Sequence, residues 1–485
     1  EICACLVGSE MCIRDRRQIA DESTVLLKND KGLLPLNLSE LNSIAVIGPN
    51  ADQVQFGDYT WSRTNKDGVT PLEGIRKLTE PFGIQIRYAQ GCSMMSLDTI
   101  HIASAVEAAR QSDVAILFCG SSSASLARDY NETNCGEGFD LADLALTGAQ
   151  GKLIKAIHAT GKPVILVLVT GKPFSIAWEK KHIPAILIQW YAGEQEGSSI
   201  ANILFGKTNP SGHLTVSFPQ SSGHLPAYYN HLPTDRGFYH KPGSYEQPGR
   251  DYVFSSPGPL WAFGHGLTYT TFNYTDMQIQ QSIDSIKVFV TVKNTGRWAG
   301  KAVPQLYVRD VFSSISTPVK QLKAFNKVAL EPGETTRVPL HFAVQDLALT
   351  DEAGKTMVEP GSFEIMIGDA SDHILLKQTI SIGQNMAVSP CSIKEQLPEE
   401  IGKGNIIHIK GVVRDVQATP VDKVEIYSTA QQQVIGVTDQ NGKYFIDAPE
   451  DDVLVFCKSG YLDEKVNVDR KNDIQITIRN KMVFP

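Results

Sequence analysis

Glu137 is a carboxylate between two glycines in the stretch NCGEGFDLADLALTGAQ, residues 134–150. Flanking glycines permit unusual backbone angles and the close approach of a ligand. A glutamate on such a loop can give a proton to a leaving group and later take one from water. The same pattern is also typical of a surface turn. The residue types alone therefore leave two interpretations of Glu137 open, a proton-transfer residue and a turn.

Sequence patterns for several other kinds of chemistry are missing from the chain. The stretch VIGPNAD (46–52) lacks the GxGxxG of dinucleotide binding, and Ala201 occupies the first glycine position of a phosphate-loop pattern that would end in GKT. There is no GxSxG nucleophile elbow and no HExxH zinc helix. The eight cysteines include no CxxC pair and no Cys/His cluster, so we interpret them as buried or free thiols. We expect no metal and no organic cofactor.

Charge and the lengths of the apolar stretches argue against nucleic-acid binding and against a membrane span. Lys and Arg number 45 against 53 for Asp and Glu, which gives a formal net charge of −8 without a long run of either sign. Nucleic-acid binding rests on clustered cations, so we expect no nucleic-acid partner. No apolar stretch approaches the roughly 20 residues that cross a bilayer, so no membrane span is expected. The sequence does not indicate an oligomeric state.

The first half of the chain has the pattern of a layered α/β domain. A chain of 485 residues is expected to divide, because single cores stop growing at roughly 250–300 residues. Continuous Val/Ile/Leu runs that alternate with amphipathic helices are typical of a parallel sheet covered on both faces. Ligands bind beyond the carboxyl ends of such strands, and the loop 119–145 that carries Glu137 follows one run directly. The apolar runs are 114–120, 163–171 and 184–193, and the helical stretches are 98–112, 146–161 and 196–206.

The second half has the pattern of β structure. From residue 271 to 383, short segments alternate apolar and polar residues between breaks rich in Gly, Pro and Asp, which predicts a β-sandwich. Residues 384–403 have no stable period and are interpreted as a linker. A second, smaller β-sandwich is expected over residues 404–485, where Asn441 and Gly442 form a hairpin-turn dipeptide.

The first 16 residues are unusual for the start of a protein. CLVGSEMCIRDR (5–16) has neither helical nor strand periodicity, and it resembles the translation of a sequencing-adapter sequence. We therefore expect residues 1–16 to be a non-native leader. The native sequence would then begin near Arg17, in the middle of a longer protein.

Six stretches, taken in order, resemble the landmarks of the family 3 glycoside hydrolases. The resemblance covers residues 17–383 and implies an α/β sandwich over 17–270, flavodoxin-like with a mostly parallel sheet, followed by a fibronectin type III-like domain over 271–383. Residues 404–485 resemble a carboxypeptidase regulatory-like β-sandwich. The six stretches are ESTVLLKNDKGLLPL (22–36), IAVIGPNAD (44–52), GEGFDLADLALTGAQGKLIKAI (136–157), GKPVILVLVTGKP (161–173), WYAGEQEGSSIANILFGKTNPSGHLTVSFP (190–219) and WAFGHGLTYTTF (261–272).

The resemblance also implies roles for individual residues. Members of this family carry an Asp nucleophile in an N-terminal (β/α)8 barrel and a general acid/base Glu on a loop of the second domain, and two carboxyl groups are what glycoside hydrolysis requires. The match puts Glu137 in the acid/base role, with Glu132 as the alternative. Leu141 follows Asp140 where the family often has arginine, so the loop-fixing ion pair of the family has no arginine at this position.

Five further residues have two interpretations each. Arg128 and Asp129 could line the substrate pocket or belong to a solvated turn. Glu194 and Glu196 are expected to be scaffold rather than catalytic residues, because their stretch resembles a strand-to-helix turn. Trp61 could stack on a sugar face, although an ordinary packed tryptophan is the simpler interpretation.

The resulting hypothesis is the C-terminal part of a retaining exo-β-glycosidase that acts on an oligosaccharide or β-glycoside. The nucleophile would lie in a missing N-terminal barrel, and β-glucosidase activity is expected before β-xylosidase activity. A periplasmic or secreted location is expected. The alternative is a non-catalytic carbohydrate-binding or adhesion protein, and an in-frame barrel in the genomic sequence upstream of Arg17 would distinguish the two.

Overall fold

The structure of the chain is a computed structural model, and it describes residues 10–60, 62, 64–123, 132–233, 244, 246–248, 252–352, 354–383, 386–387, 404–431, 433–458 and 461–479. These residues form two compact units. The first unit comprises Glu1–Phe342 and Gly361–Ile382, and the second comprises Ala343–Pro360 and Gly383–Pro485.

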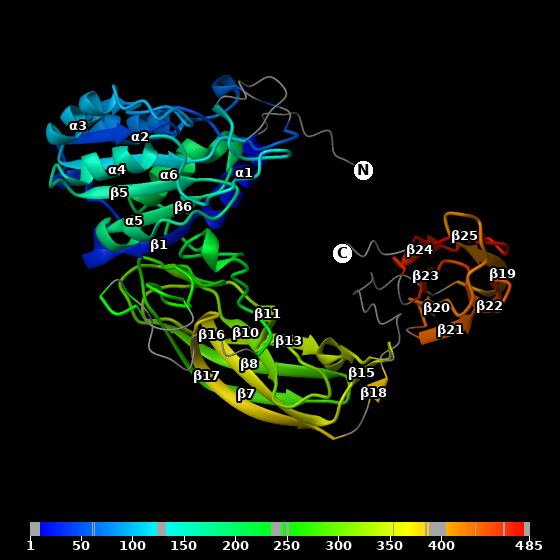
Figure 1. Ribbon diagram of the computed structural model, residues 1–485. Helices are drawn as coiled ribbons and strands as arrows, with labels where there is room; N and C mark the ends of the chain where they lie inside the picture. The colour runs from blue at the N-terminus through cyan, green and yellow to red at the C-terminus, as the bar shows by residue number, and fades with distance from the viewer. Residues whose placement is uncertain are drawn as a thin grey trace. The chain divides into compact units, whose positions relative to one another are not determined.

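A six-stranded sheet is the centre of the α/β domain in the first unit (Figure 1). Its strand order is β1-β6-β5-β4-β2-β3, in which β1 is antiparallel to β6 and the other neighbours are parallel. The five parallel strands have the flavodoxin-like order, as predicted. The strands are β1 (Val25–Asn29), β2 (Ser43–Ile47), β3 (Gln85–Ala89), β4 (Val114–Gly120), β5 (Val164–Val169) and β6 (Ala185–Gln189).

Helices cover both faces of this sheet, which explains why its central strands are apolar throughout. Ala105 of α3 and Leu153 of α4 belong to the core on one face, whereas Leu72 of α2 and Ile200 of α6 belong to the core on the other. Each helical stretch expected from the sequence contains a helix. The helices are α1 (Glu10–Ser23), α2 (Pro71–Thr79), α3 (Ile102–Arg110), α4 (Gln150–His158), α5 (Ala177–His182) and α6 (Glu196–Leu204).

Short 3-10 helices occupy several of the connections. Those described in the first unit are η1 (Asp30–Gly32), η2 (Leu38–Glu40), η3 (Asn65–Asp67), η4 (Glu80–Phe82), η6 (Gly193–Gln195) and η7 (Ser222–His224). The second unit contains η8 (Val344–Leu347).

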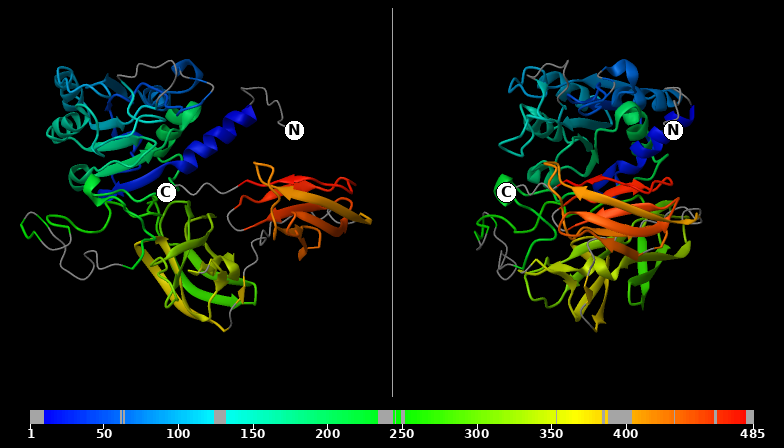
Figure 2. Two further views of the ribbon diagram at one scale, coloured as in Figure 1. Left: turned by 45° about the vertical axis from the view of Figure 1, so that its right-hand side comes forward. Right: turned by 90° about the vertical axis from the view of Figure 1, so that its right-hand side faces the viewer.

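Helix α1 differs from what the sequence suggested for the first 16 residues. It begins at Glu10, so part of the predicted leader is helical, and it runs beside α6 (Figure 2). The Arg16 guanidinium lies 2.6 Å from the Glu194 carboxylate. An ion pair with a distant residue leaves no periodic signal, which is why the sequence showed no helix here. The non-native origin of residues 1–16 stays a prediction.

The second part of the first unit is a β-sandwich, as expected from period-two alternation. Ile286, Val288 and Val290 of β8 are fully buried, and so is Ile365 of β16. The sheets have the orders β11-β10-β16-β17, β13-β8-β7 and β12-β9. The strands are β7 (Phe272–Gln281), β8 (Ser285–Asn294), β9 (Gly300–Ala302), β10 (Gln305–Asp310), β11 (Gln321–Phe325), β12 (Val328–Leu330), β13 (Thr335–Ala343), β16 (Gly361–Ala370) and β17 (His373–Ile382).

The second unit contains the smaller β-sandwich predicted at the end of the chain. Sheets β22-β19-β25 and β21-β20-β23-β24 share an apolar core that includes Ile409, Ile426 and Phe456. The likeness to a carboxypeptidase regulatory-like domain stays a prediction. Its strands are β19 (Ile406–Arg414), β20 (Glu425–Ser428), β21 (Gln433–Val437), β22 (Lys443–Pro449), β23 (Val453–Cys457), β24 (Glu464–Asn467) and β25 (Ile476–Thr477).

A small three-stranded sheet includes two residues of the predicted linker. Strands β14 (Leu349–Thr350), β15 (Thr356–Val358) and β18 (Met386–Ala387) pair in the order β14-β15-β18. The strand β18 lies inside the predicted linker 384–403, so that segment is not wholly irregular. Two residues that pair with a distant strand are too short a signal for a sequence pattern.

The described residues also test the prediction that the cysteines are buried or free thiols. Cys92, Cys119 and Cys135 are buried free thiols, and burial raises the pKa of Cys92 to about 12. Cys457 was expected to be a thiol but forms a disulfide, which corrects that interpretation.

In the part of the chain that the structure describes, no helix is long and apolar enough to cross a membrane, and no cluster of three potential metal ligands occurs.

Candidate active site

Polar residues gather beyond the carboxyl ends of the central strands. Because β2, β4, β5 and β6 are parallel, the connections that follow them meet at one edge of the sheet. At this edge Asn50, which follows β2, donates from its amide to the Ser121 carbonyl, which follows β4, at 3.0 Å. The connections that follow neighbouring strands are thus joined directly.

Glu137 lies in a turn, and its side chain is exposed. The flanking glycines have φ values of +113° at Gly136 and +79° at Gly138, which residues with a Cβ rarely adopt. The N–H of Phe139 donates to the Gly136 carbonyl at 3.1 Å and closes the turn. The turn interpretation is therefore correct for the backbone. Because the side chain of Glu137 is exposed, its carboxylate is also accessible to a ligand.

Asp58 joins the turn to the connection that follows β2. Its Oδ2 accepts the backbone N–H of Glu137 at 2.9 Å, and its Oδ1 accepts the hydroxyl of Ser123. The carboxylate approaches so closely that a Cβ on Gly136 would stand 2.2 Å from Oδ2. The first glycine of GEG therefore makes room for this contact.

Side-chain amides fix the return of the Glu137 loop to the end of β4. Asn134 Oδ1 accepts the Ser122 N–H at 2.9 Å, and Asn134 Nδ2 donates to the Thr147 hydroxyl at 2.8 Å. Gln150, at the start of α4, accepts the Gly120 N–H at 2.8 Å. The residues on either side of the turn are thus held by the end of β4 and by the start of α4.

Residues that follow β5 and β6 form hydrogen bonds with the loop that carries Glu137. The Tyr191 hydroxyl lies 2.5 Å from the Ser121 hydroxyl, which donates to Thr170 at 3.0 Å. Burial is the main reason that the pKa of Tyr191 lies well above its usual value. The ammonium group of Lys172 donates to the Phe139 carbonyl at 3.1 Å, two residues after Glu137.

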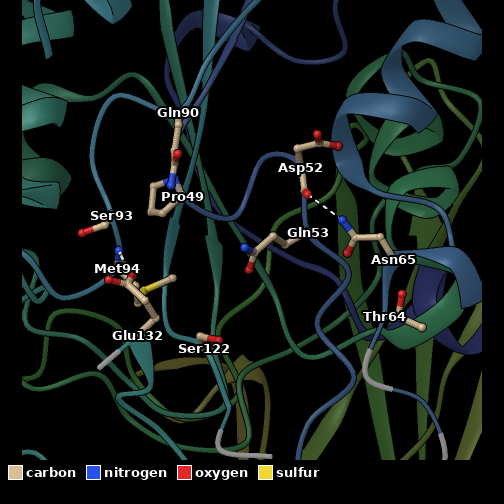
Figure 3. Close-up of a pocket in the computed structure, with 10 residues that line it drawn as sticks. All are labelled: Pro49, Asp52, Gln53, Thr64, Asn65, Gln90, Ser93, Met94, Ser122 and Glu132. Atoms are coloured by element: carbon tan, nitrogen blue, oxygen red, sulfur yellow. Dashed lines mark hydrogen bonds between the residues drawn. The ribbon is translucent and has the colours of Figure 1, made fainter. Parts of the chain in front are cut away.

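Glu132, the alternative acid, lies in a different environment. It is half-buried, and its Oε2 accepts the Met94 N–H at 2.8 Å. It lines a pocket of about 700 Å³ between the connections that follow β2, β3 and β4 (Figure 3). This is the topological switch point of the sheet, where open α/β domains bind ligands. The other lining residues are Pro49, Asp52, Gln53, Thr64, Asn65, Gln90, Ser93, Met94 and Ser122.

The sequence and fold match those of known glycosidases. Residues 24–269 match the Glycosyl hydrolase family 3 C-terminal domain, and residues 302–371 match the Fibronectin type III-like domain. A β-xylosidase of Formosa agariphila is 39% identical over 376 residues, which cover 75% of this chain and 49% of that relative. The periplasmic β-glucosidase of Salmonella typhimurium is 37% identical over 388 residues, covering 74% and 49%.

The chain belongs to glycoside hydrolase family 3. A solved β-glucosidase from Erythrobacter marinus has 36% sequence identity and a TM-score of 0.68, with 77% of this chain and 51% of that chain covered. This family 3 chain spans about half the length of the curated relatives it matches.

The structure describes some of the other residues considered from the sequence and leaves out the rest. Arg128, Asp129 and Trp61 lie outside the described residues. Glu196 is fully buried and accepts the Gln55 N–H at 2.6 Å, which is a scaffold contact. Glu194 makes the ion pair with α1 described above.

The sequence analysis does not single out Asp58, although this residue lies only three positions before Trp61. The signal that could have found it is the position of this aspartate after β2, because that strand lies beside β4. Only the strand order reveals that the two connections meet.

Proposed function

We propose that this family 3 chain supplies the general acid/base of a retaining exo-β-glycosidase. In the proposed reaction, Glu137 protonates the glycosidic oxygen as the bond to the leaving group breaks. A carboxylate nucleophile attacks the anomeric carbon and forms a covalent glycosyl-enzyme. Glu137 then removes a proton from the water that hydrolyses this intermediate.

The observation that carries the proposal is the exposed carboxylate of Glu137 on an anchored turn. A catalytic acid must reach the substrate, and it must be held in place to act. The Glu137 side chain is exposed while its backbone N–H is bound by Asp58. Glu132 is a weaker candidate, because one of its oxygens is committed to the Met94 backbone.

The second carboxylate is assigned to a segment outside this chain. A double displacement needs a nucleophile as well as an acid/base. The proposal therefore places the nucleophile in an N-terminal barrel, which agrees with relatives about twice the length of the matched segment. The names of the relatives support β-glucosidase as the first activity and β-xylosidase as the second. The substrate would be an oligosaccharide or another β-glycoside.

We further propose that the full-length protein is exported. The Salmonella relative is described as periplasmic, and Cys457 forms a disulfide, which is typical of oxidising compartments. A native N-terminus without an apolar signal region would contradict this proposal.

The test uses the full-length enzyme with Glu137→Gln. Loss of the acid should lower kcat/KM by about 100- to 10,000-fold for glycosides with poor leaving groups, because these need full protonation. Activated aryl glycosides, such as dinitrophenyl glycosides, need little protonation for bond cleavage. With these substrates, azide should rescue turnover and give a β-glycosyl azide. Equal losses across all leaving groups, without azide rescue, would show that the GEG stretch is only a turn.

A further inference from the structure

We propose that Asp58 is the positioning residue of the acid/base and holds Glu137 at the leaving group through the backbone of its turn. The inference rests on the proposed role of Glu137 and adds a residue that the sequence did not suggest. The relevant contacts join two connections that are 79 residues apart in sequence.

Both oxygens of the Asp58 carboxylate are used on the loop that follows β4. Oδ1 accepts the hydroxyl of Ser123, close to the end of the strand, and Oδ2 accepts the N–H of Glu137. A single side chain therefore binds the loop near its start and at its reactive residue. Hydrogen bonds to a charged acceptor are shorter and stronger than neutral ones, which suits a residue whose position must stay fixed.

The turn is shaped around this carboxylate. Gly136 has φ +113°, and a Cβ there would stand 2.2 Å from Oδ2 and 2.8 Å from the carboxyl carbon of Asp58. Nothing lies within 4 Å of a Cβ on Gly138, so the crowding is confined to the side that faces Asp58. The backbone of Glu137 is thereby fixed while its side chain stays exposed.

A fixed backbone affects the chemistry because proton transfer depends on position. Displacement of a catalytic group by about 1 Å can cost on the order of 100-fold in rate. The backbone N–H of Glu137 is close to the side chain. Asp58 binds this N–H without contacting the Glu137 carboxylate. Asp58 therefore acts on the acid through the main chain and leaves the carboxylate free to exchange a proton with substrate.

The test compares Asp58→Ala, Asp58→Asn and Glu137→Gln in the full-length enzyme, across aryl glycosides of increasing leaving-group pKa. Alanine removes both contacts. Asparagine can keep both, because its oxygen can accept the Glu137 N–H while its NH₂ donates to the Ser123 hydroxyl. We expect Asp58→Ala to lower kcat/KM about 10- to 100-fold for poor leaving groups and less than about threefold for activated ones. Asp58→Asn should stay within about threefold of the natural enzyme throughout.

Two further measurements separate positioning from folding. Asp67, in the same connection, accepts the Ser62 hydroxyl at 2.5 Å and makes no described contact with the Glu137 loop. Asp67→Ala should lower Tm without changing the dependence on leaving group. The double variant Asp58→Ala/Glu137→Gln should be no slower than Glu137→Gln alone, because the two residues act as one unit.

The outcomes distinguish this inference from the proposed function. If Asp58→Ala slows all substrates equally, or if its losses multiply with those of Glu137→Gln, Asp58 is only structural and the inference is overturned. If Glu137→Gln itself shows no dependence on leaving group, the proposed function has failed, and the assignment of Asp58 fails with it.

Discussion

The carboxylate of Glu132 accepts the backbone N–H of Met94 at 2.8 Å. This hydrogen bond joins the connection that follows β4 to the one that follows β3, and both residues line the switch-point pocket (Figure 3). Glu137, five residues later, has its side chain in solvent and its backbone bound by Asp58. The Glu132 carboxylate is therefore bound to the backbone of another connection, whereas the Glu137 carboxylate is exposed.

Glu132→Ala should act on stability rather than on proton transfer. It leaves the Met94 N–H without its acceptor, and we expect the free energy of unfolding to fall by about 1 to 2 kcal/mol. Activity should fall by the same factor for good and poor leaving groups, with no azide rescue. Thermal unfolding and a leaving-group series check both parts. A strong leaving-group dependence in this variant, with none in Glu137→Gln, would exchange the roles of the two residues.

Glu22→Gln should weaken the junction between α1 and the fibronectin type III-like domain. Glu22 binds the ammonium groups of Lys301 and Lys327, the second at 3.1 Å. Burial alone would raise the pKa of Glu22, but hydrogen bonds from Lys301, Gln18 and Lys327 outweigh it and lower the pKa to about 2. The pairs are partly exposed to solvent, so we expect a loss of about 1 kcal/mol at pH 7.

The pH dependence of this difference has a definite sign. A depressed carboxyl pKa stabilises the folded state above the unfolded value of about 4.5, and the contribution is lost as pH falls towards 2. The natural chain and Glu22→Gln should therefore differ in urea unfolding at pH 7 and converge between pH 4.5 and 2. The control is Glu107→Gln, because Glu107 is paired only with the uncharged Gln111 in its described contacts. A difference that persists unchanged below pH 3 would contradict the ion-pair explanation.

The sheet was predictable from sequence because burial on both faces leaves a continuous apolar run, such as residues 114–120 of β4. The position of Glu137 beyond a strand end followed from the same pattern. The contact with Asp58 did not, because it depends on β2 lying beside β4 after an intervening strand and two helices. Helix α1 and strand β18 were missed for a related reason, since contacts with distant parts of the chain fix them.

The 485-residue chain alone should not hydrolyse an aryl β-glucoside. One carboxyl group cannot carry out a double displacement, and the proposed nucleophile belongs to another segment. The measurement is aryl release by the purified chain beside its own Glu137→Ala variant. Turnover clearly above that of the variant would show that a complete site exists in this chain.

The last prediction compares alanine at the two glycines of the GEG turn. Both positions have positive φ, so each substitution should cost about 1 to 2 kcal/mol of backbone strain. Only a Cβ at Gly136 collides with Asp58, whereas nothing stands within 4 Å of one at Gly138. In the full-length enzyme, Gly136→Ala should therefore reproduce the leaving-group dependence of Asp58→Ala, and Gly138→Ala should mainly lower Tm. If the two variants lose activity alike on poor and activated substrates, backbone strain alone explains the glycines, and the close approach of Asp58 has no catalytic importance.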